Sequence, residues 1–248
     1  MSITFAGLSP HPPLIIPEVG GQRRKEVQKT IDSLHELGQE VVNSKPEVLI
    51  TISPHGPILR DGIAVIYSEN LKGDFRDFGV PQARYEVKSH PKFIDELKSK
   101  TNENNIKLEK LKKEDLQSYG FSNELDHGVM VPLHYLLEAG LDVPVVAISM
   151  GLLDYQTLYE FGKLLDETLK DMNLDGAILA SGDLSHKLKP GAPAGYNPEA
   201  ENFDKELTTL LSQGKFEDVL NMDKGLIEKA GECGYRPIIM ALGAIHDY

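Results

Sequence analysis

Val48-Leu49-Ile50-Thr51-Ile52 is a short apolar run that leads directly into Ser53-Pro54-His55. Residues 3–8 form a second apolar run, which leads into Ser9-Pro10-His11. A third run, residues 177–180, leads through Ser181-Gly182-Asp183-Leu184-Ser185 to His186. Runs of this length and composition are typical of buried strands. Residues just past the carboxyl ends of parallel strands line the ligand crevice of an α/β sheet, so the sequence predicts that three histidines converge there.

Amphipathic segments alternate with these runs. The expected strands are residues 3–8, 47–52, 62–67, 143–150 and 175–180, and the expected helices are residues 24–43, 91–100, 127–139, 155–172, 198–212 and 235–244. Residues 74–85 are expected to form a loop or a short strand, and residues 187–197 a loop that borders the pocket. The pattern predicts an α/β fold with a single domain over residues 1–248. Its central sheet is mostly parallel or mixed and flanked by helices, with a metal site at the strand carboxyl ends.

The composition is typical of a globular protein with a core, at 40% hydrophobic and 26% charged residues. A net charge of -12 argues against a nucleic-acid partner. Two stretches, residues 22–25 and 107–113, are basic, but acidic residues flank or interrupt them, so both are expected to be solvated faces. The sequence shows no signal peptide and no apolar run of membrane-spanning length, so no membrane is expected. One cysteine, Cys233, rules out a disulfide within the chain and favours the cytoplasm.

His11 and His55 are the first candidates for metal ligands. Each follows a proline, which restricts the backbone and pre-positions the imidazole. Imidazole is the commonest protein metal ligand. One such turn alone would more often hold a histidine without a partner, but the repeated Ser-Pro-His favours a shared site.

The third ligand has two neighbouring candidates in Gly231-Glu232-Cys233-Gly234. Glu232 would complete a facial triad of two histidines and one carboxylate, which leaves open positions on Fe(II). Its alternative role is that of an acid at the N-terminus of the last helix. Cys233 is either a thiolate ligand, which suits a softer metal, or a small buried apolar residue.

His186 and His127 are candidates for proton transfer and substrate contact. Asp183 lies close enough in sequence to orient the His186 imidazole, as carboxylates do at metal and catalytic sites. Alternatively, Asp183 caps a helix and His186 is incidental. His127 opens a predicted helix and can touch a substrate.

Taken together, these motifs resemble the class III extradiol ring-cleaving dioxygenases, which include the catalytic B-type subunit of protocatechuate 4,5-dioxygenase and the DOPA dioxygenases. The resemblance covers nearly the whole chain. It rests on five motifs in order, Ser9-Pro10-His11-Pro12-Pro13, Ser53-Pro54-His55-Gly56, Asp126-His127-Gly128, Ser181-Gly182-Asp183-Leu184-Ser185-His186 and Gly231-Glu232-Cys233-Gly234. Residues 124–128 and 232–237 resemble more narrowly the Memo-like branch, often encoded beside or fused to an AMMECR1 domain and a radical SAM protein. The sequence ends on a predicted helix. Together with the Memo-like resemblance, this leads us to expect a fragment of a longer chain that carries a C-terminal AMMECR1 domain.

The dioxygenase resemblance implies a role for each candidate. His11, His55 and Glu232 would bind Fe(II), His186 would be the acid/base histidine, and His127 would lie near the substrate. The implied reaction is O₂-dependent ring cleavage of a catechol-type aromatic, without an organic cofactor.

The Memo-like resemblance implies an alternative. There a cysteine serves as the third ligand, so Cys233 replaces Glu232 and the protein binds iron or copper without cleaving a ring. A zinc hydrolase is a third hypothesis. The expected protein partners are a second copy of the chain, as a homodimer, and an AMMECR1 domain.

Overall fold

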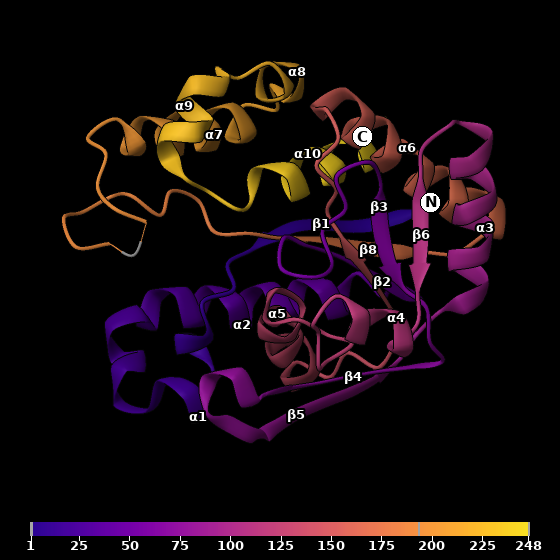
Figure 1. Cartoon of the computed structure of the whole chain (residues 1–248), viewed down its shortest axis with the longest axis horizontal. Helices are drawn as coiled ribbons and strands as arrows, with labels where there is room; N and C mark the ends of the chain where they lie inside the picture. Colours follow the sequence, from indigo (N-terminus) through magenta and orange to yellow (C-terminus); the bar gives the residue numbers. More distant parts are fainter. Residues whose placement is uncertain (1, 193, 248) are drawn as a thin grey trace.

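A six-stranded sheet runs through the centre of the computed structural model, which describes residues 2–192 and 194–247 (Figure 1). In sheet order the strands are β1 (Ile3–Ser9), β8 (Gly176–Ser181), β2 (Val48–Ser53), β7 (Val145–Ser149), β3 (Ile63–Ile66) and β6 (Leu108–Leu111). The first four are mutually parallel; β3 is antiparallel to β7 and parallel to β6. The predicted α/β fold with a mixed sheet is confirmed.

Helices cover both faces of this sheet because its inner strands are apolar on both sides. Every residue of β2, β7 and β8 is buried, as expected for parallel strands between two helical layers. One core packs the sheet against α3 (Pro91–Glu103), α6 (Tyr155–Met172) and α10 (Tyr235–Ala244). The other packs it against α2 (Gln28–Asn43) and α5 (His127–Glu138). In Figure 1 these two layers lie above and below the sheet, and α7 (Ala200–Ser212), α8 (Phe216–Leu220) and α9 (Lys224–Ala230) extend beyond α10.

A separate hairpin lies beyond α5 in Figure 1. Its strands are β4 (Asn70–Phe75) and β5 (Val80–Lys88), which pair antiparallel. The 3-10 turn η3 (Arg76–Phe78) joins them, and Gly79 ends this turn in the left-handed region at φ 78°. The prediction of a loop or short strand at 74–85 thus falls inside a longer hairpin.

Several local features differ from the sequence predictions. The segment 107–113, expected to be a solvated basic face, contains strand β6, whose end residues Leu108 and Leu111 are buried while Glu109 and Lys110 between them are part-buried. Short helical segments that were not predicted include η1 (Pro13–Ile15), α1 (Pro17–Gly20), η3, α4 (Lys113–Ser118), α8 and α9, and the helix expected from residue 24 begins as η2 (Gly21–Val27). Of the predicted pocket loop 187–197, residue 193 lies outside the described residues.

None of the helices in the described ranges is both long enough and apolar enough to cross a membrane.

Candidate metal centre

The strand register brings the two Ser-Pro-His turns to the same edge of the sheet. β8 lies between β1 and β2, parallel to both, and Ser181 at its end pairs with Ser9 at the end of β1. The chain leaves β1 and β2 at this edge, and His11 and His55 each follow two residues after the last strand residue. Two histidines far apart in sequence therefore meet because their strands share one neighbour.

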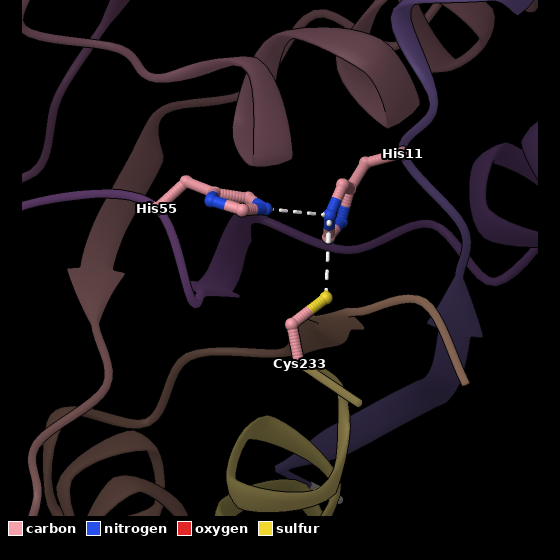
Figure 2. A group of neighbouring side chains, drawn as sticks. All are labelled: His11, His55 and Cys233. Atoms are coloured by element: carbon pink, nitrogen blue, oxygen red, sulfur yellow. Dashed lines mark hydrogen bonds between the residues drawn. The ribbon is translucent and has the colours of Figure 1, made fainter. Parts of the chain in front are cut away.

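His11, His55 and Cys233 form a compact group of metal-type donor atoms (Figure 2). Their donor atoms all lie within 4.8 Å of one another. The Nε2 atoms of the two histidines are 2.9 Å apart, and Cys233 Sγ is 3.6 Å from His11 Nε2. Figure 2 shows dashed lines from the imidazole of His11 to His55 and to Cys233.

These separations fit ligands that share one ion. Two imidazole nitrogens at about 2.0–2.1 Å from a metal stand roughly 2.9–3.4 Å apart for angles of about 90–110°. A nitrogen and a thiolate sulfur at about 2.3 Å stand roughly 3.1–3.6 Å apart over the same range. Both the nitrogen pair and the nitrogen–sulfur pair therefore agree with a common metal ion.

Ser181 fixes the orientation of His11. The Ser181 hydroxyl donates its proton to the backbone carbonyl of Gly128 at 2.5 Å, so toward His11 the Ser181 oxygen can only accept a hydrogen bond. His11 Nδ1 lies 2.9 Å from the same oxygen. We infer that His11 carries its proton on Nδ1 and donates it to Ser181, which leaves the Nε2 lone pair free for a metal.

Burial keeps both histidines neutral. Burial first, and repulsion from the neighbouring His55, His127 and His186 second, lower the pKa of His11 to about 3. The pKa of His55 falls to about 4 for the same reasons, burial first and His127 second. Neutral imidazole is the form that binds metals, so these two ligands need no deprotonation near neutral pH.

Cys233 reaches the histidines because two backbones approach closely. A Cβ atom on Gly182 would lie only 2.1 Å from the Gly234 Cα, so glycine alone lets the chain after β8 pass the start of α10. The backbone N–H of Asp183 donates to Cys233 Sγ at 3.2 Å. Burial raises the pKa of the thiol to about 12, so a metal would have to displace its proton.

His186 lies next to this group. Its Nε2 is 3.8 Å from Cys233 Sγ and 4.0 Å from the nearer oxygen of Asp183. That carboxylate also accepts from the His11 backbone N–H at 3.2 Å. Since His186 is 37% exposed, it can exchange protons with solvent.

His127 stands over His55, at the start of α5. The ring centroids are 4.1 Å apart with an angle of 30° between the planes. Both rings line a cavity of about 250 Å³, whose far wall includes Phe78 from the hairpin. Burial lowers the pKa of His127, and the Asp77 carboxylate acts in the opposite direction.

Glu232 makes a different contact. Its carboxylate accepts a hydrogen bond of 2.6 Å from the backbone N–H of Tyr235, in the first turn of α10. Burial raises the pKa of this carboxyl. Among the described residues, the donor group with His11 and His55 contains Cys233 and not Glu232. The role of Glu232 as a ligand stays a prediction, and the contact seen matches the alternative role of a helix N-terminal acid.

Sequence reasoning did not assign a role to the serines that end the strands. Ser53 donates to Asp126 at 2.6 Å and accepts from the backbone N–H of His55 at 3.2 Å. Asp126 also caps α5 by accepting from Gly128 N at 2.7 Å. Ser53 and Ser181 thus tie both histidine turns to α5. The available signal was that a serine, Ser9, Ser53 or Ser181, directly follows three of the predicted strands.

Comparison with known proteins places the chain in a family. Residues 5–248 match the family described as the catalytic LigB subunit of aromatic ring-opening dioxygenase. Protein CA_C1420 of Clostridium acetobutylicum is 34% identical over 245 residues, which are 99% of this chain and 52% of that protein. The chain therefore spans about half the length of that relative.

More distant relatives carry two kinds of name. The 4,5-DOPA dioxygenase extradiol of Beta vulgaris is 28% identical over 79% of this chain and 69% of that protein. The MEMO1 family protein MJ0403 of Methanocaldococcus jannaschii is 26% identical over 86% of this chain and 65% of that protein. The crystal structure of the uncharacterized protein JW3007 from Escherichia coli K12 has the same fold, with a TM-score of 0.57, 21% identity, and coverage of 86% of this chain and 80% of that one. The chain belongs to the LigB family of aromatic ring-opening dioxygenase subunits.

Proposed function

We propose that the protein binds one Fe(II) ion through His11, His55 and Cys233 and uses it to cleave a catechol-type aromatic with O₂. The observation that carries the proposal is the group of three donor atoms, two of them neutral imidazole nitrogens, beside a cavity. Bound iron would supply Lewis acidity toward the two hydroxyls of the substrate and electrons for the reaction with O₂. Copper and zinc are the alternative ions, since a thiolate ligand favours softer metals than a carboxylate does.

The residues around the group have distinct tasks. Ser181 holds the His11 ring so that Nε2 faces the other donors. His186 accepts a proton from a substrate hydroxyl and returns it later, a role that contributes about 10²–10⁴ in rate. His127 and Phe78 flank the space beside His55 and orient a flat ring there.

Cys233 also supports a second function, in which the protein binds a metal ion without cleaving a ring. A thiolate takes the position that a carboxylate would hold in a facial triad of the non-haem Fe(II) oxygenases. The MEMO1 family protein and the DOPA dioxygenase compared above are about equally distant from this chain in sequence. An AMMECR1-domain partner and a homodimer belong to this proposal as well.

The test is O₂ uptake by the iron-loaded protein with a panel of catechols, run beside His186→Ala and His35→Ala, a control at an exposed histidine of α2. The proposal expects uptake and a ring-opened product with the wild-type and control proteins, and no turnover with His186→Ala, whose iron binding stays intact. Loss of iron in His186→Ala would show that its role is misassigned. Iron binding without uptake on any catechol would favour the second function.

A further inference from the structure

One wall of the cavity beside His55 and His127 is the tip of the β4–β5 hairpin. Asp77 and Phe78 are adjacent at this tip, within η3, and both line the cavity. The Phe78 ring lies 5.3 Å from the ring of His127 and 5.9 Å from that of Phe75, which is fully buried. The hairpin tip is thus anchored on its inner side and presents a carboxylate and an aromatic ring together.

The charge on this cavity is negative. No lysine or arginine is found among the described residues that line it. The charge of Asp74 is compensated by Arg76, whose guanidinium forms a bidentate ion pair with the carboxylate at 2.8 and 2.7 Å. Asp126 is held by Ser53 and by a backbone N–H. Asp77 is exposed and forms no ion pair within the described part of the chain; the neighbouring Arg76 attracts it only from beyond ion-pair distance, because the Arg76 guanidinium is bound to Asp74.

Phe78 adds a second reason to expect a cation. Phe78 is 40% exposed and lines the cavity, although a phenyl ring is favoured out of water. The face of an aromatic ring attracts ammonium groups, and a neighbouring carboxylate adds an ion pair. A negatively charged ligand would meet Asp77 without any compensating cation on the cavity wall.

From this arrangement we infer that Asp77 and Phe78 form a subsite for a protonated amine, and that the substrates are small catechol-type aromatics carrying a net positive charge. The inference rests on the proposed function for the diol end of the molecule, which faces His55. The ammonium end lies at the hairpin tip, where it pairs with Asp77 and covers the exposed ring of Phe78.

The test compares three catechols of similar size and different charge on iron-loaded protein under anaerobic conditions. Dopamine is the cation, 4-ethylcatechol the neutral probe and 3,4-dihydroxyphenylacetate the anion, with dissociation constants measured by calorimetry. Dopamine should bind most tightly and the anion least. Asp77→Asn should weaken dopamine binding by up to about fivefold and leave 4-ethylcatechol binding unchanged, since an exposed ion pair is worth at most about 1 kcal/mol. Asp142→Asn, another exposed aspartate that does not line this cavity, is the matched control and should change neither.

The outcomes separate the two proposals. Equal affinity for the three catechols, or the same loss of dopamine affinity in both variants, overturns the ammonium subsite and leaves the proposed function standing. If no catechol binds the iron-loaded protein, the proposed function fails and the subsite with it. Raised salt should weaken dopamine binding and not that of 4-ethylcatechol, which distinguishes the ion pair from a change in cavity shape.

Discussion

Replacing Ser181 with alanine tests how the fold prepares His11 for a metal. The hydroxyl bridges His11 Nδ1 at 2.9 Å and the Gly128 carbonyl at 2.5 Å, and it is fully buried. Its removal leaves a buried N–H and a buried carbonyl without this partner, at a cost of about 1–3 kcal/mol for each group. It also frees the imidazole to take the other tautomer or to rotate. Loss of such an orienting partner typically weakens metal binding about 10–100-fold.

Ser9→Ala is the matched control for this variant. Ser9 is paired with Ser181 across the sheet and is also fully buried, but its hydroxyl donates to the Pro10 carbonyl. The assay is an anaerobic Fe(II) titration, with the imidazole tautomer of the metal-free protein read by nitrogen NMR. We expect Ser181→Ala to lose iron affinity and the single Nδ1–H tautomer of His11, while Ser9→Ala keeps both. Equal iron affinity in the two variants, with an unchanged tautomer, would show that Ser181 does not orient His11.

Three further predictions follow from the same geometry. Iron binding should release one proton from the Cys233 thiol, so the apparent iron affinity should rise about tenfold per pH unit between pH 6 and 8. Calorimetric titrations in buffers of different ionisation enthalpy count the released proton. No proton would be released if a carboxylate were the ligand in place of the thiol. The metal-free protein should lose stability as the pH falls from 7 to 5, because the pKa values of His11 and His55, about 3 and about 4, lie below that of an unfolded histidine and the unfolded chain therefore takes up protons first. Thermal denaturation of His11→Gln should depend less on pH than that of the wild type. An unchanged pH dependence would argue against a buried neutral His11. Gly182→Ala should destabilise the fold by about 1–3 kcal/mol and abolish iron binding, because the added Cβ would push α10 and Cys233 away. In the control Gly225→Ala the added Cβ meets only one side-chain oxygen, at 3.1 Å, so both stability and iron binding should be unchanged.

The strands and the convergence of the histidines could be predicted because both depend on short-range patterns. The apolar run before His55 is the fully buried strand β2, but the run before His11 is the edge strand β1, where residues 4–8 are part-buried or exposed, so the expectation of a buried strand was wrong there. The parallel pairing of both strands through β8 follows from the alternation with helices. The β4–β5 hairpin was harder to predict. Its strand β5 alternates mostly exposed residues with a few buried ones, so the apolar periodicity is weak.

The choice between Glu232 and Cys233 could not be made from the sequence. The two side chains are adjacent, and which one faces the histidines depends on how the turn before α10 packs against Gly182. That contact joins residues far apart in the chain, so no local pattern reports it. Ser181 was similarly out of reach, because its role depends on the Gly128 carbonyl of a different element.

Anaerobic Fe(II) titration of the Cys233→Ser and Glu232→Gln variants tests most directly whether His11, His55 and Cys233 hold the metal. We expect stoichiometric iron binding by the wild type, near-wild-type binding by Glu232→Gln, and binding weakened by at least about tenfold in Cys233→Ser. Binding that survives in Cys233→Ser and disappears in Glu232→Gln would exclude the cysteine and assign the third ligand to the carboxylate.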